Sequence, residues 1–261
     1  MKAEFHIISV FDKPQLGFRG NPSAVVFLPQ ALDTRKLQAI ASDFNQPATT
    51  FLWQEQGKWQ VRWFAPDAEI GLCGHGTLAA FAALSNSEAS TVTLHFGSSK
   101  ATGGMLSNGD CYLELEPIGI GASIPVPTAI QEGLGVDVLE MYETENKHLI
   151  VVKDAATVTS IKPNFSRLRD SEIFGYAVTA AGDDVDFVSR TLVPHVQQLE
   201  DHATGSSHVV LTGFWSQKLK KNKLTAHQWS KRGGAFLCEQ LENQVRLSGS
   251  HTAWAKGELS I

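Results

Sequence analysis

The stretch that decides the fold is Glu69-Ile70-Gly71-Leu72-Cys73-Gly74-His75-Gly76-Thr77-Leu78-Ala79-Ala80-Phe81-Ala82-Ala83-Leu84. It reads as a polar, glycine-bracketed loop that runs into a helix of alanine, leucine and phenylalanine with almost no polar face. A helix that is apolar all round is a buried helix. Its first turn would bring unpaired backbone N–H groups, a cysteine and a histidine into the interior, and its glycines leave room for a ligand. This arrangement is typical of an anion site.

A second stretch of the same kind is Asp201-His202-Ala203-Thr204-Gly205-Ser206-Ser207-His208-Val209-Val210-Leu211. It is again a small polar loop with a glycine that leads into an apolar run. We therefore expect two halves, each built around one central helix. The segment from Pro117 to Pro127 is rich in proline and glycine and is the predicted linker. The predicted halves are residues 1–117 and 118–261, with the final strand returning to pack on the first half.

The remaining patterns are mostly those of strands. Alternation over 49–53 and 59–64 around Gln56-Gly57 predicts a hairpin, and residues 33–45 have helical periodicity with Asp33 as an N-cap. The connections are too short for a regular βαβ series, so the predicted class is α+β. The sequence has neither a Rossmann fingerprint nor a phosphate-binding P-loop. Further strands are predicted at 5–10, 18–28, 91–96, 111–115, 148–152, 176–179, 186–190, 226–230, 234–239 and 244–249.

Composition and charge exclude several classes of protein. A hydrophobic fraction of 43% with 19% charged residues is that of a folded globular chain, and a net charge of −5 argues against nucleic acid as a partner. The one basic run, Lys218 to Lys223, is interpreted as a solvated helix end. We find neither a signal-type N-terminus nor an apolar window long enough to span a membrane, and we expect a cytoplasmic protein. The three cysteines lack metal-type spacing, so we predict no disulfide framework and no metal site.

Five strings of residues, in this order, point to a family. They are Phe18-Arg19-Gly20-Asn21-Pro22 followed by Ala24-Val25-Val26; Arg62-Trp63-Phe64-Ala65-Pro66 leading to Glu69; Cys73-Gly74-His75-Gly76; Asp201 with Thr204-Gly205-Ser206 and His208; and Ser230-Lys231-Arg232-Gly233-Gly234. Together they resemble the PhzF family of phenazine-biosynthesis isomerase-like proteins over the whole chain. The resemblance implies a diaminopimelate epimerase-like fold: two pseudo-symmetric halves, each a curved mixed sheet around a central helix, with the active site between them. It also implies a homodimer.

The resemblance also implies a chemistry, namely proton transfer without a cofactor on a small carboxylate metabolite, as in a biosynthetic isomerase or epimerase. In this family a glutamate moves the proton, helped by a histidine and an aspartate that match His75 and Asp201. The glutamate falls in a Ser-Glu-Thr-Ala-Phe string, whereas this chain has Pro47-Ala48-Thr49-Thr50-Phe51, so Ala48 occupies its position. A methyl group cannot abstract a proton. Two interpretations stay open: an enzyme with altered chemistry, and an inactive member that binds a metabolite or a protein.

Each candidate residue has a functional and a structural interpretation. His75 is a proton shuttle or a core histidine, and Asp201 is a proton-handling group or a helix cap. Cys73 is a base at a helix start or a small buried hydrophobe. A racemase with paired cysteines is disfavoured because the second position matches Thr204. The residues expected to bind the substrate carboxylate are Asn21, Cys73, Gly74, Gly76, Thr77, Thr204, Gly205 and Ser206.

Three further side chains in or near these strings are candidates. Asp67 and Glu69 are carboxylates that would orient His75 or replace the missing base. Arg232 is either an anion contact or part of a strand-entry turn. The tryptophans, Trp63 and Trp215 among them, are predicted to be core residues.

Overall fold

The structure is a computed structural model that describes residues 2–85, 90–145 and 147–261. The chain forms two compact units: unit 1 is Met1–Leu115 with Ser248–Ile261, and unit 2 is Glu116–Leu247. The elements of unit 1 are β1 (Lys2–Asp12), the 3-10 helix η1 (Pro14–Leu16), β2 (Asn21–Phe27), α1 (Thr34–Phe44), β3 (Ala48–Glu55), β4 (Lys58–Phe64), β5 (Glu69–Ile70), α2 (Gly74–Leu84), β6 (Ser90–Phe96), β7 (Ser99–Met105) and β8 (Cys111–Leu115), together with most of β17 (Val245–Ser260).

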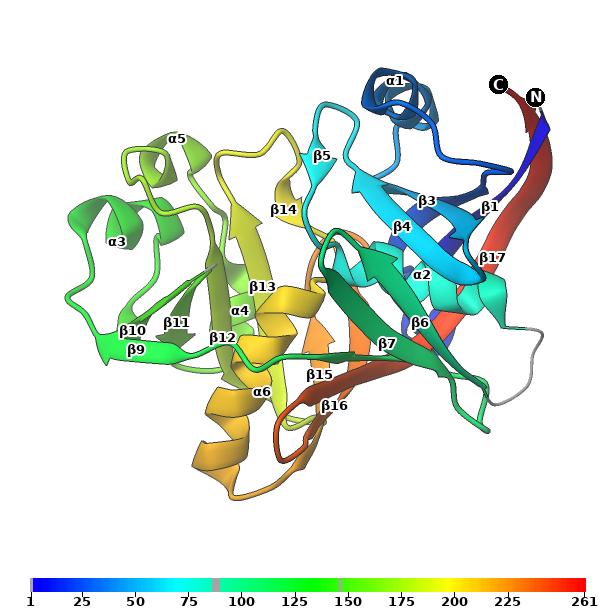
Figure 1. Cartoon of the computed structure of the whole chain (residues 1–261). Helices are drawn as coiled ribbons and strands as arrows, with labels where there is room; N and C mark the ends of the chain where they lie inside the picture. Colours follow the sequence, from blue (N-terminus) through cyan, green and yellow to red (C-terminus); the bar gives the residue numbers. More distant parts are fainter. Residues whose placement is uncertain (1, 86–89, 146) are drawn as a thin grey trace. The chain divides into compact units, whose positions relative to one another are not determined.

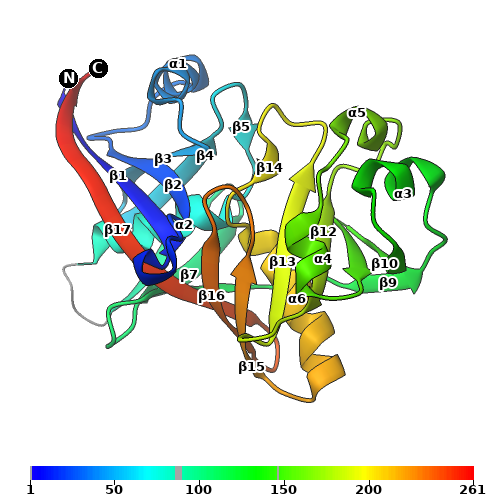
Figure 2. The same cartoon turned by 180° about the vertical axis from the view of Figure 1, so that it is seen from behind.

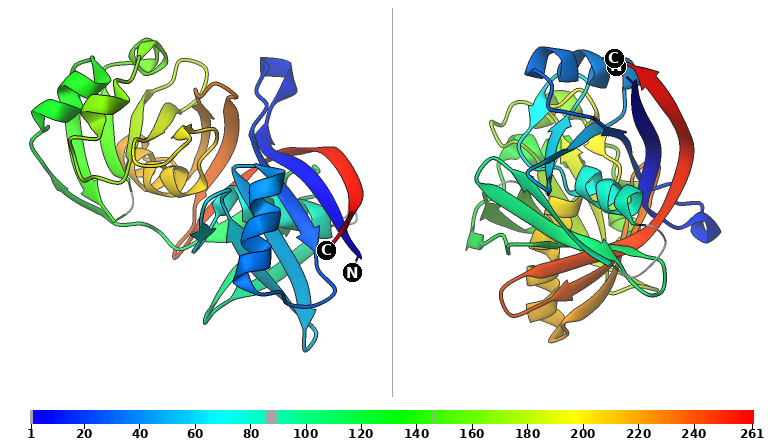
Figure 3. Two further views of the ribbon diagram at one scale, coloured as in Figure 1. Left: turned by 90° about the horizontal axis from the view of Figure 1, so that it is seen from above. Right: turned by 45° about the vertical axis from the view of Figure 1, so that its right-hand side comes forward.

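The strands of unit 1 pair in a closed ring. The order is β17, β1, β2, β3, β4, β6, β7 and β8, and β8 pairs again with β17. Helix α2 packs against β1, β2, β3, β7 and β8 of this ring (Figure 2). Its residues from His75 to Ala82 are all buried, which confirms the predicted buried helix. The beginning of β1 and the end of β17 lie side by side in this ring, because Lys2 is opposite Ser260 (Figure 3).

Unit 2 is a second mixed sheet with its own central helix. Helix α6 packs on β12, β15 and β16, and α4 packs on β12 and β13 (Figure 1). A separate core of buried apolar side chains, including Met141, Ile150, Val178 and Leu192, fills this unit. Its elements are β9 (Ile120–Ser123), α3 (Thr128–Leu134), β10 (Val138–Thr144), β11 (His148–Val152), α4 (Ala155–Ser160), α5 (Phe165–Leu168), β12 (Tyr176–Ala181), β13 (Phe187–Val193), β14 (Leu199–Asp201), α6 (Gly205–Leu219), β15 (Lys223–Gln228) and β16 (Gly234–Gln240).

The two units repeat one topology. In unit 1, β1–β2 is antiparallel, β2–β3 parallel, β3–β4 and β4–β5 antiparallel, β4–β6 parallel and β6–β7 antiparallel. In unit 2 the pairs β10–β11, β11–β12, β12–β13, β13–β14, β13–β15 and β15–β16 follow in the same order with the same directions. The two strands of each parallel pair are connected along the chain through a helix. Because antiparallel pairs lie between the parallel pairs, the sheets are mixed and the class is α+β as predicted. Helices α2 and α6 occupy equivalent places in the repeat.

The hairpin at Gln56-Gly57 and the helix capped by Asp33 are confirmed. The predicted linker, 117–127, follows the boundary between the units at Leu115, but it also contains β9, which pairs with β10 of unit 2. Helices α3, α4 and α5 were not predicted, since each is at most seven residues long and shows too little of a 3.6-residue period. Trp63 and Trp215 are buried as expected, whereas Trp229 and Trp254 are exposed, so the prediction of core tryptophans is wrong for these two. Within the described residues, no helix has the length and apolar character needed to cross a membrane.

Candidate functional site

The start of α2 places a thiol beside an imidazole. Cys73 is the N-cap residue, and His75 lies in the first turn. The sulfur of Cys73 lies 3.5 Å from Nδ1 and 3.8 Å from Nε2 of His75, and both residues are buried. A histidine at the positive end of a helix is favoured in its neutral form, which can both accept and donate a proton. This pair is the part of unit 1 best suited to acid–base chemistry.

Two of the predicted substrate-binding residues of α2, Gly76 and Thr77, make contacts that stabilise the helix and its packing. A Cβ atom on Gly76 would lie 2.7 Å from Oγ1 of Thr50 and 2.9 Å from Cδ1 of Trp63, so only glycine lets α2 approach β3 and β4 this closely. Thr50 also donates a hydrogen bond to the carbonyl of Gly76 at 3.2 Å. The hydroxyl of Thr77 donates to the carbonyl of Cys73 at 2.7 Å. The small size of Gly76 and the hydroxyl of Thr77 therefore have structural explanations within the helix.

Ala48 lies on the face of β3 that looks toward α2. Side chains alternate along a strand, so Ala48 shares a face with Thr50, whose hydroxyl contacts the first turn of α2. Ala48 is fully buried and lies opposite Ser23 of β2. Asn21, another expected binding residue, begins β2 and is also fully buried. A longer side chain at position 48 would thus extend on the side of the strand where α2 begins.

Glu69 is not placed as a substitute base. Both of its carboxylate oxygens accept hydrogen bonds from Arg62, at 2.7 Å from Nε and 2.6 Å from Nη2. The hydrogen bond from Arg62 lowers the pKa of Glu69, which holds the carboxylate charged and poor at accepting a proton. Asp67 is exposed. The prediction that Glu69 replaces the missing base is therefore not supported by its contacts.

The start of α6 has the same backbone geometry as that of α2. Thr204 is its N-cap residue, with φ −112° and ψ 107°, compared with −118° and 105° for Cys73. Asp201 ends β14, and Oδ2 of its carboxylate accepts a hydrogen bond of 2.7 Å from the hydroxyl of Thr204. The N-cap is thus Thr204, and the interpretation of Asp201 as an ordinary helix cap is wrong.

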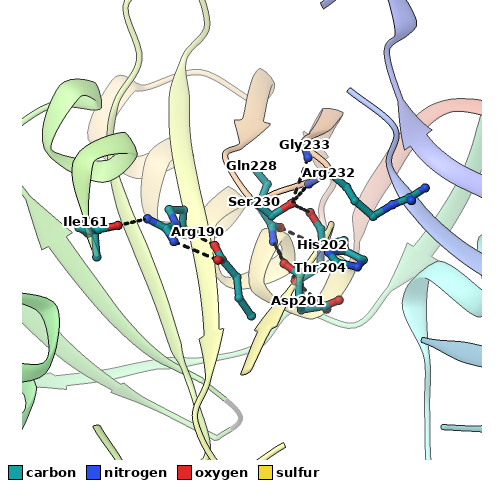
Figure 4. Close-up of polar contacts among 10 residues, drawn as sticks. Ile161, Arg190, Asp201, His202, Thr204, Gln228, Ser230, Arg232 and Gly233 are labelled. Carbon is teal, nitrogen blue, oxygen red and sulfur yellow. Dashed lines mark hydrogen bonds and ion pairs between the residues drawn. The ribbon is translucent and has the colours of Figure 1, made fainter. Parts of the chain in front are cut away.

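Gln228 orders this helix start, and the sequence did not single it out. The residue ends β15 and is fully buried. Its Oε1 accepts from the backbone N–H of Thr204 at 2.8 Å, while Nε2 donates to the carbonyl of Asp201 at 2.7 Å and to Oγ1 of Thr204 at 3.2 Å (Figure 4). One amide therefore satisfies the N-cap residue and the strand that carries Asp201. A glutamine at the end of a predicted strand gives no such signal.

The Ser230–Gly233 string is a turn that binds the loop between β14 and α6. Ser230 donates from Oγ to the carbonyl of His202 at 2.6 Å and accepts from the backbone N–H groups of Arg232 and Gly233 (Figure 4). Gly233 has φ +68°, a conformation that favours glycine. These contacts fit the interpretation of 230–234 as a strand-entry turn.

A largely buried ion pair supports strand β14, which ends at Asp201. Arg190 of β13 binds Glu200 of β14 through two hydrogen bonds and also donates to the carbonyl of Ile161 at 2.6 Å (Figure 4). By the topological repeat, this pair is equivalent to Arg62–Glu69 of unit 1, because Phe64 is opposite Glu69 and Leu192 is opposite Glu200. In each unit, an arginine thus binds a glutamate of the short strand that precedes the central helix.

Helix α6 carries a fully buried, neutral histidine, His208, in its first half. This histidine donates from Nδ1 to the carbonyl of Thr204 at 2.9 Å and stacks on Phe236, with ring centroids 3.5 Å apart. Burial lowers the pKa of His208 to about 4. Among the described residues, no group of three or more His, Cys, Asp or Glu side chains is arranged to hold a metal ion.

Comparisons with known proteins identify the family of the chain. The family described as phenazine biosynthesis-like protein matches residues 9–103 and 126–257. A Pseudomonas aeruginosa protein named as an uncharacterized isomerase is 34% identical over 98% of this chain and 98% of its own. The crystal structure of a PhzF family protein from Enterococcus faecalis, 35% identical, covers 100% of both chains with a TM-score of 0.91.

A protein with little sequence similarity to this chain has the same fold. A hydroxyproline epimerase from Agrobacterium vitis aligns over 99% of this chain and 92% of its own, with a TM-score of 0.63 at 8% identity, which shows the fold alone. The predicted epimerase-like architecture is therefore confirmed. Both matched segments of the family include a central helix and its polar start. The chain belongs to the PhzF family of phenazine biosynthesis-like proteins.

Proposed function

We propose that the protein is an isomerase or epimerase that transfers a proton on a small carboxylate metabolite without a cofactor, with His75 and Asp201 as its proton-handling groups. The observation that carries the proposal is the build of the helix start in unit 2. There the Asp201 carboxylate is oriented by the Thr204 hydroxyl, which is itself held by Gln228. Such support is what a reacting carboxylate needs to keep a fixed geometry.

The start of α2 supplies the second group. His75 is buried beside Cys73 in the first turn, where a neutral imidazole can both accept and donate a proton. The backbone N–H groups at the two helix starts provide donors for a carboxylate and for negative charge that develops during proton abstraction. The family's usual glutamate is replaced by Ala48 in this proposal, so the acid–base work falls to the groups that remain.

Ala48 supports a second candidate function. Its buried methyl group leaves the α2-facing side of β3 without an acid–base group at that position. A chain that retains the anion-binding helix starts but has lost its base would bind a carboxylate metabolite without converting it.

Deuterium incorporation from heavy water into a panel of carboxylated metabolites separates the two candidates. We expect exchange in the wild type, and a loss of about 100-fold or more in His75→Gln and in Asp201→Asn, because general acid–base groups contribute at this level. His195→Gln is the matched control, since His195 is exposed and its Nε2 donates a hydrogen bond to the carbonyl of Ser171. Exchange that survives in both site variants would refute the assignment of His75 and Asp201.

Absence of exchange in the wild type would favour the binding protein. In that case Ala48→Glu provides a direct check, since it places a carboxylate where the family has one. Exchange gained in this variant, together with binding of the same compound by the wild type, would establish a protein that binds the metabolite but has lost the base.

A further inference from the structure

Three side chains with soft donor atoms meet on neighbouring strands of unit 1. Met105 ends β7, Cys111 begins β8, and His251 lies in β17. The sulfur of Cys111 lies 3.9 Å from the sulfur of Met105 and 3.4 Å from Nδ1 of His251. Met105 and Cys111 are buried, whereas His251 is half-buried. The group is therefore shielded from water at its two sulfurs and accessible at its imidazole.

Strand pairing brings these three side chains together. β8 pairs with β7 on one side and with β17 on the other. Met105 is directly opposite Cys111, so their side chains share one face of the sheet. The hairpin that joins them is closed by a hydrogen bond of 2.8 Å from the N–H of Leu106 to the carbonyl of Asp110. His251 reaches Cys111 across 140 positions of the chain, so the spacing of the cysteines, on which the prediction of no metal site rested, gave no sign of this group.

Asp12 fixes the segment of β17 that carries His251. Its carboxylate accepts hydrogen bonds of 2.6 and 2.5 Å from the hydroxyls of Ser250 and Thr252, the two neighbours of His251 along the strand. Asp12 is only 3% exposed, and its negative charge acts on both Cys111 and His251. The imidazole is therefore held by a backbone that is fixed on both sides, as a metal site requires, and the nearby charge favours a cation.

The distances fit a single ion bound between the three donor atoms. A metal ion such as zinc lies about 2.3 Å from sulfur and about 2.0 Å from an imidazole nitrogen. At angles of about 100–120° around such an ion, two sulfurs are roughly 3.5–4.0 Å apart, and a sulfur and a nitrogen roughly 3.3–3.7 Å. The observed 3.9 Å between the sulfurs and 3.4 Å from sulfur to nitrogen both fall within these ranges.

The chemistry of the donor set selects a soft ion with a single charge. Thiolate and thioether sulfurs favour Cu(I), whereas Mg²⁺ and Ca²⁺ prefer oxygen ligands. Zinc is bound in proteins by cysteine, histidine and carboxylates, and a thioether is not among these ligands. A monovalent ion and one thiolate together form a neutral unit, which is suited to a position buried away from water.

We propose that Met105, Cys111 and His251 form a binding site for one Cu(I) ion, which links β17 to the β7–β8 hairpin. Burial, with the charges of Asp110 and Asp12, raises the pKa of the Cys111 thiol to about 12, so the thiol carries a proton before the ion binds. On binding, this proton passes to the solvent and a bond forms between sulfur and copper. Copper remains Cu(I), so no oxidant or reductant takes part. The site goes beyond the proposed function, since it uses neither His75 nor Asp201.

Competition with the Cu(I) chelator bicinchoninate, in oxygen-free buffer, tests the proposal. We expect the wild type to take up one equivalent of Cu(I), and Cys111→Ala to bind it about 100-fold more weakly or worse, because even outer-shell partners of a metal contribute 10–100-fold. Met105→Leu should weaken binding by about tenfold or more while it keeps the volume of the side chain, so it carries the test if Cys111→Ala does not fold. Cys238→Ala is the matched control, because Cys238 is an equally buried thiol in unit 2.

Two further measurements report on the ligands themselves. X-ray absorption at the copper edge should show two sulfur neighbours and one nitrogen neighbour in the wild type, and one sulfur fewer in Met105→Leu. Cu(I) should also raise the melting temperature of the wild type but not that of Cys111→Ala, because only the folded chain assembles the three donors.

Several outcomes would overturn the inference. They are no uptake of Cu(I) by the wild type, equal affinity in Cys111→Ala, and loss of binding in Cys238→Ala. Loss of binding in Cys73→Ser would place the ion at the start of α2 instead, where the other thiol lies beside an imidazole. Zinc bound as tightly as Cu(I), with no effect of Met105→Leu on either ion, would refute a site that depends on the thioether.

Discussion

Arg190 binds both carboxylate oxygens of Glu200, with Nε 2.7 Å from Oε1 and Nη2 2.9 Å from Oε2. Glu200 directly precedes Asp201 on β14, so the ion pair fixes the strand from which the candidate carboxylate projects. The side chains of Arg190 and Glu200 are 10% and 19% exposed, whereas those of Arg62 and Glu69 are 26% and 41% exposed. The two units thus hold equivalent ion pairs in different environments.

This difference predicts unequal costs of removal. Arg190→Met should lower the free energy of unfolding by about 3 kcal/mol or more, because it leaves Glu200 charged and largely buried. Arg62→Met should cost about 1 kcal/mol or less, since its partner is better hydrated. Urea denaturation of both variants makes the comparison, with amide exchange in β13 and in β4 reporting each unit. Equal costs would mean that burial does not set the strength of these pairs.

Gln228→Met should damage the start of α6 while keeping the volume of the side chain. It leaves the N–H of Thr204 and the carbonyl of Asp201 without their partner, at about 1–3 kcal/mol for each buried group. We expect faster amide exchange in the first turn of α6 and a lower kcat with a smaller change in KM, because Asp201 loses its orientation. Gln228→Glu, which retains only the acceptor, is the graded comparison. An unchanged kcat in a destabilised Gln228→Met would show that the network serves folding alone.

Gly76→Ala should destabilise unit 1 by about 1–3 kcal/mol, since its Cβ would overlap Thr50 and Trp63. Gly213→Ala, in the middle of α6, is the matched control because a Cβ there meets no atom within 4 Å. The control should stabilise its helix by up to about 1 kcal/mol through helix propensity. Thermal unfolding of both variants checks the pair, and a neutral Gly76→Ala would mean that α2 can shift away from β3.

The pKa of His208, lowered to about 4 by burial, predicts acid sensitivity in unit 2. Between the ordinary value of 6.5 and about 4, the unfolded chain binds a proton that the folded chain does not. Stability should therefore fall as the pH falls through this window, by roughly 3 kcal/mol in total. Denaturation of the wild type and of His208→Phe at pH 4.5 and 7 measures the difference. His148, whose pKa is also lowered by burial, is present in both proteins and cancels. An equal pH dependence in the two proteins would exclude His208 as the cause.

The sequence predicted the two central helices because each follows a small polar loop with glycine, and because α2 is apolar on all sides, a pattern that burial explains. It also predicted the hairpin strands and the polar loops at Cys73 and Thr204. The short helices α3, α4 and α5 stayed hidden, because four to seven residues are too few to display a helical period. Strand β9 was not predicted, because the surrounding prolines and glycines are typical of a linker.

The residues that order the site were harder to predict than the site itself. Gln228 and Arg190 act through partners that lie far along the chain, as Gln228 does in binding Thr204 across 24 positions. No local pattern distinguishes a glutamine that satisfies a helix start from one at the surface. Gly76 shows the converse, since its spacing suggested room for a ligand, whereas Thr50 and Trp63 occupy that space.

Strand β17 has a consequence for the order in which the protein is made. Its residues from Ser248 onward belong to unit 1, although the whole of unit 2 is synthesised between them and Leu115. During translation, β1 and β8 therefore each lack β17 as a neighbouring strand while residues 116–247 emerge from the ribosome. Unit 2 can acquire its own core first, and unit 1 closes its ring only after the strand that seals it has been released.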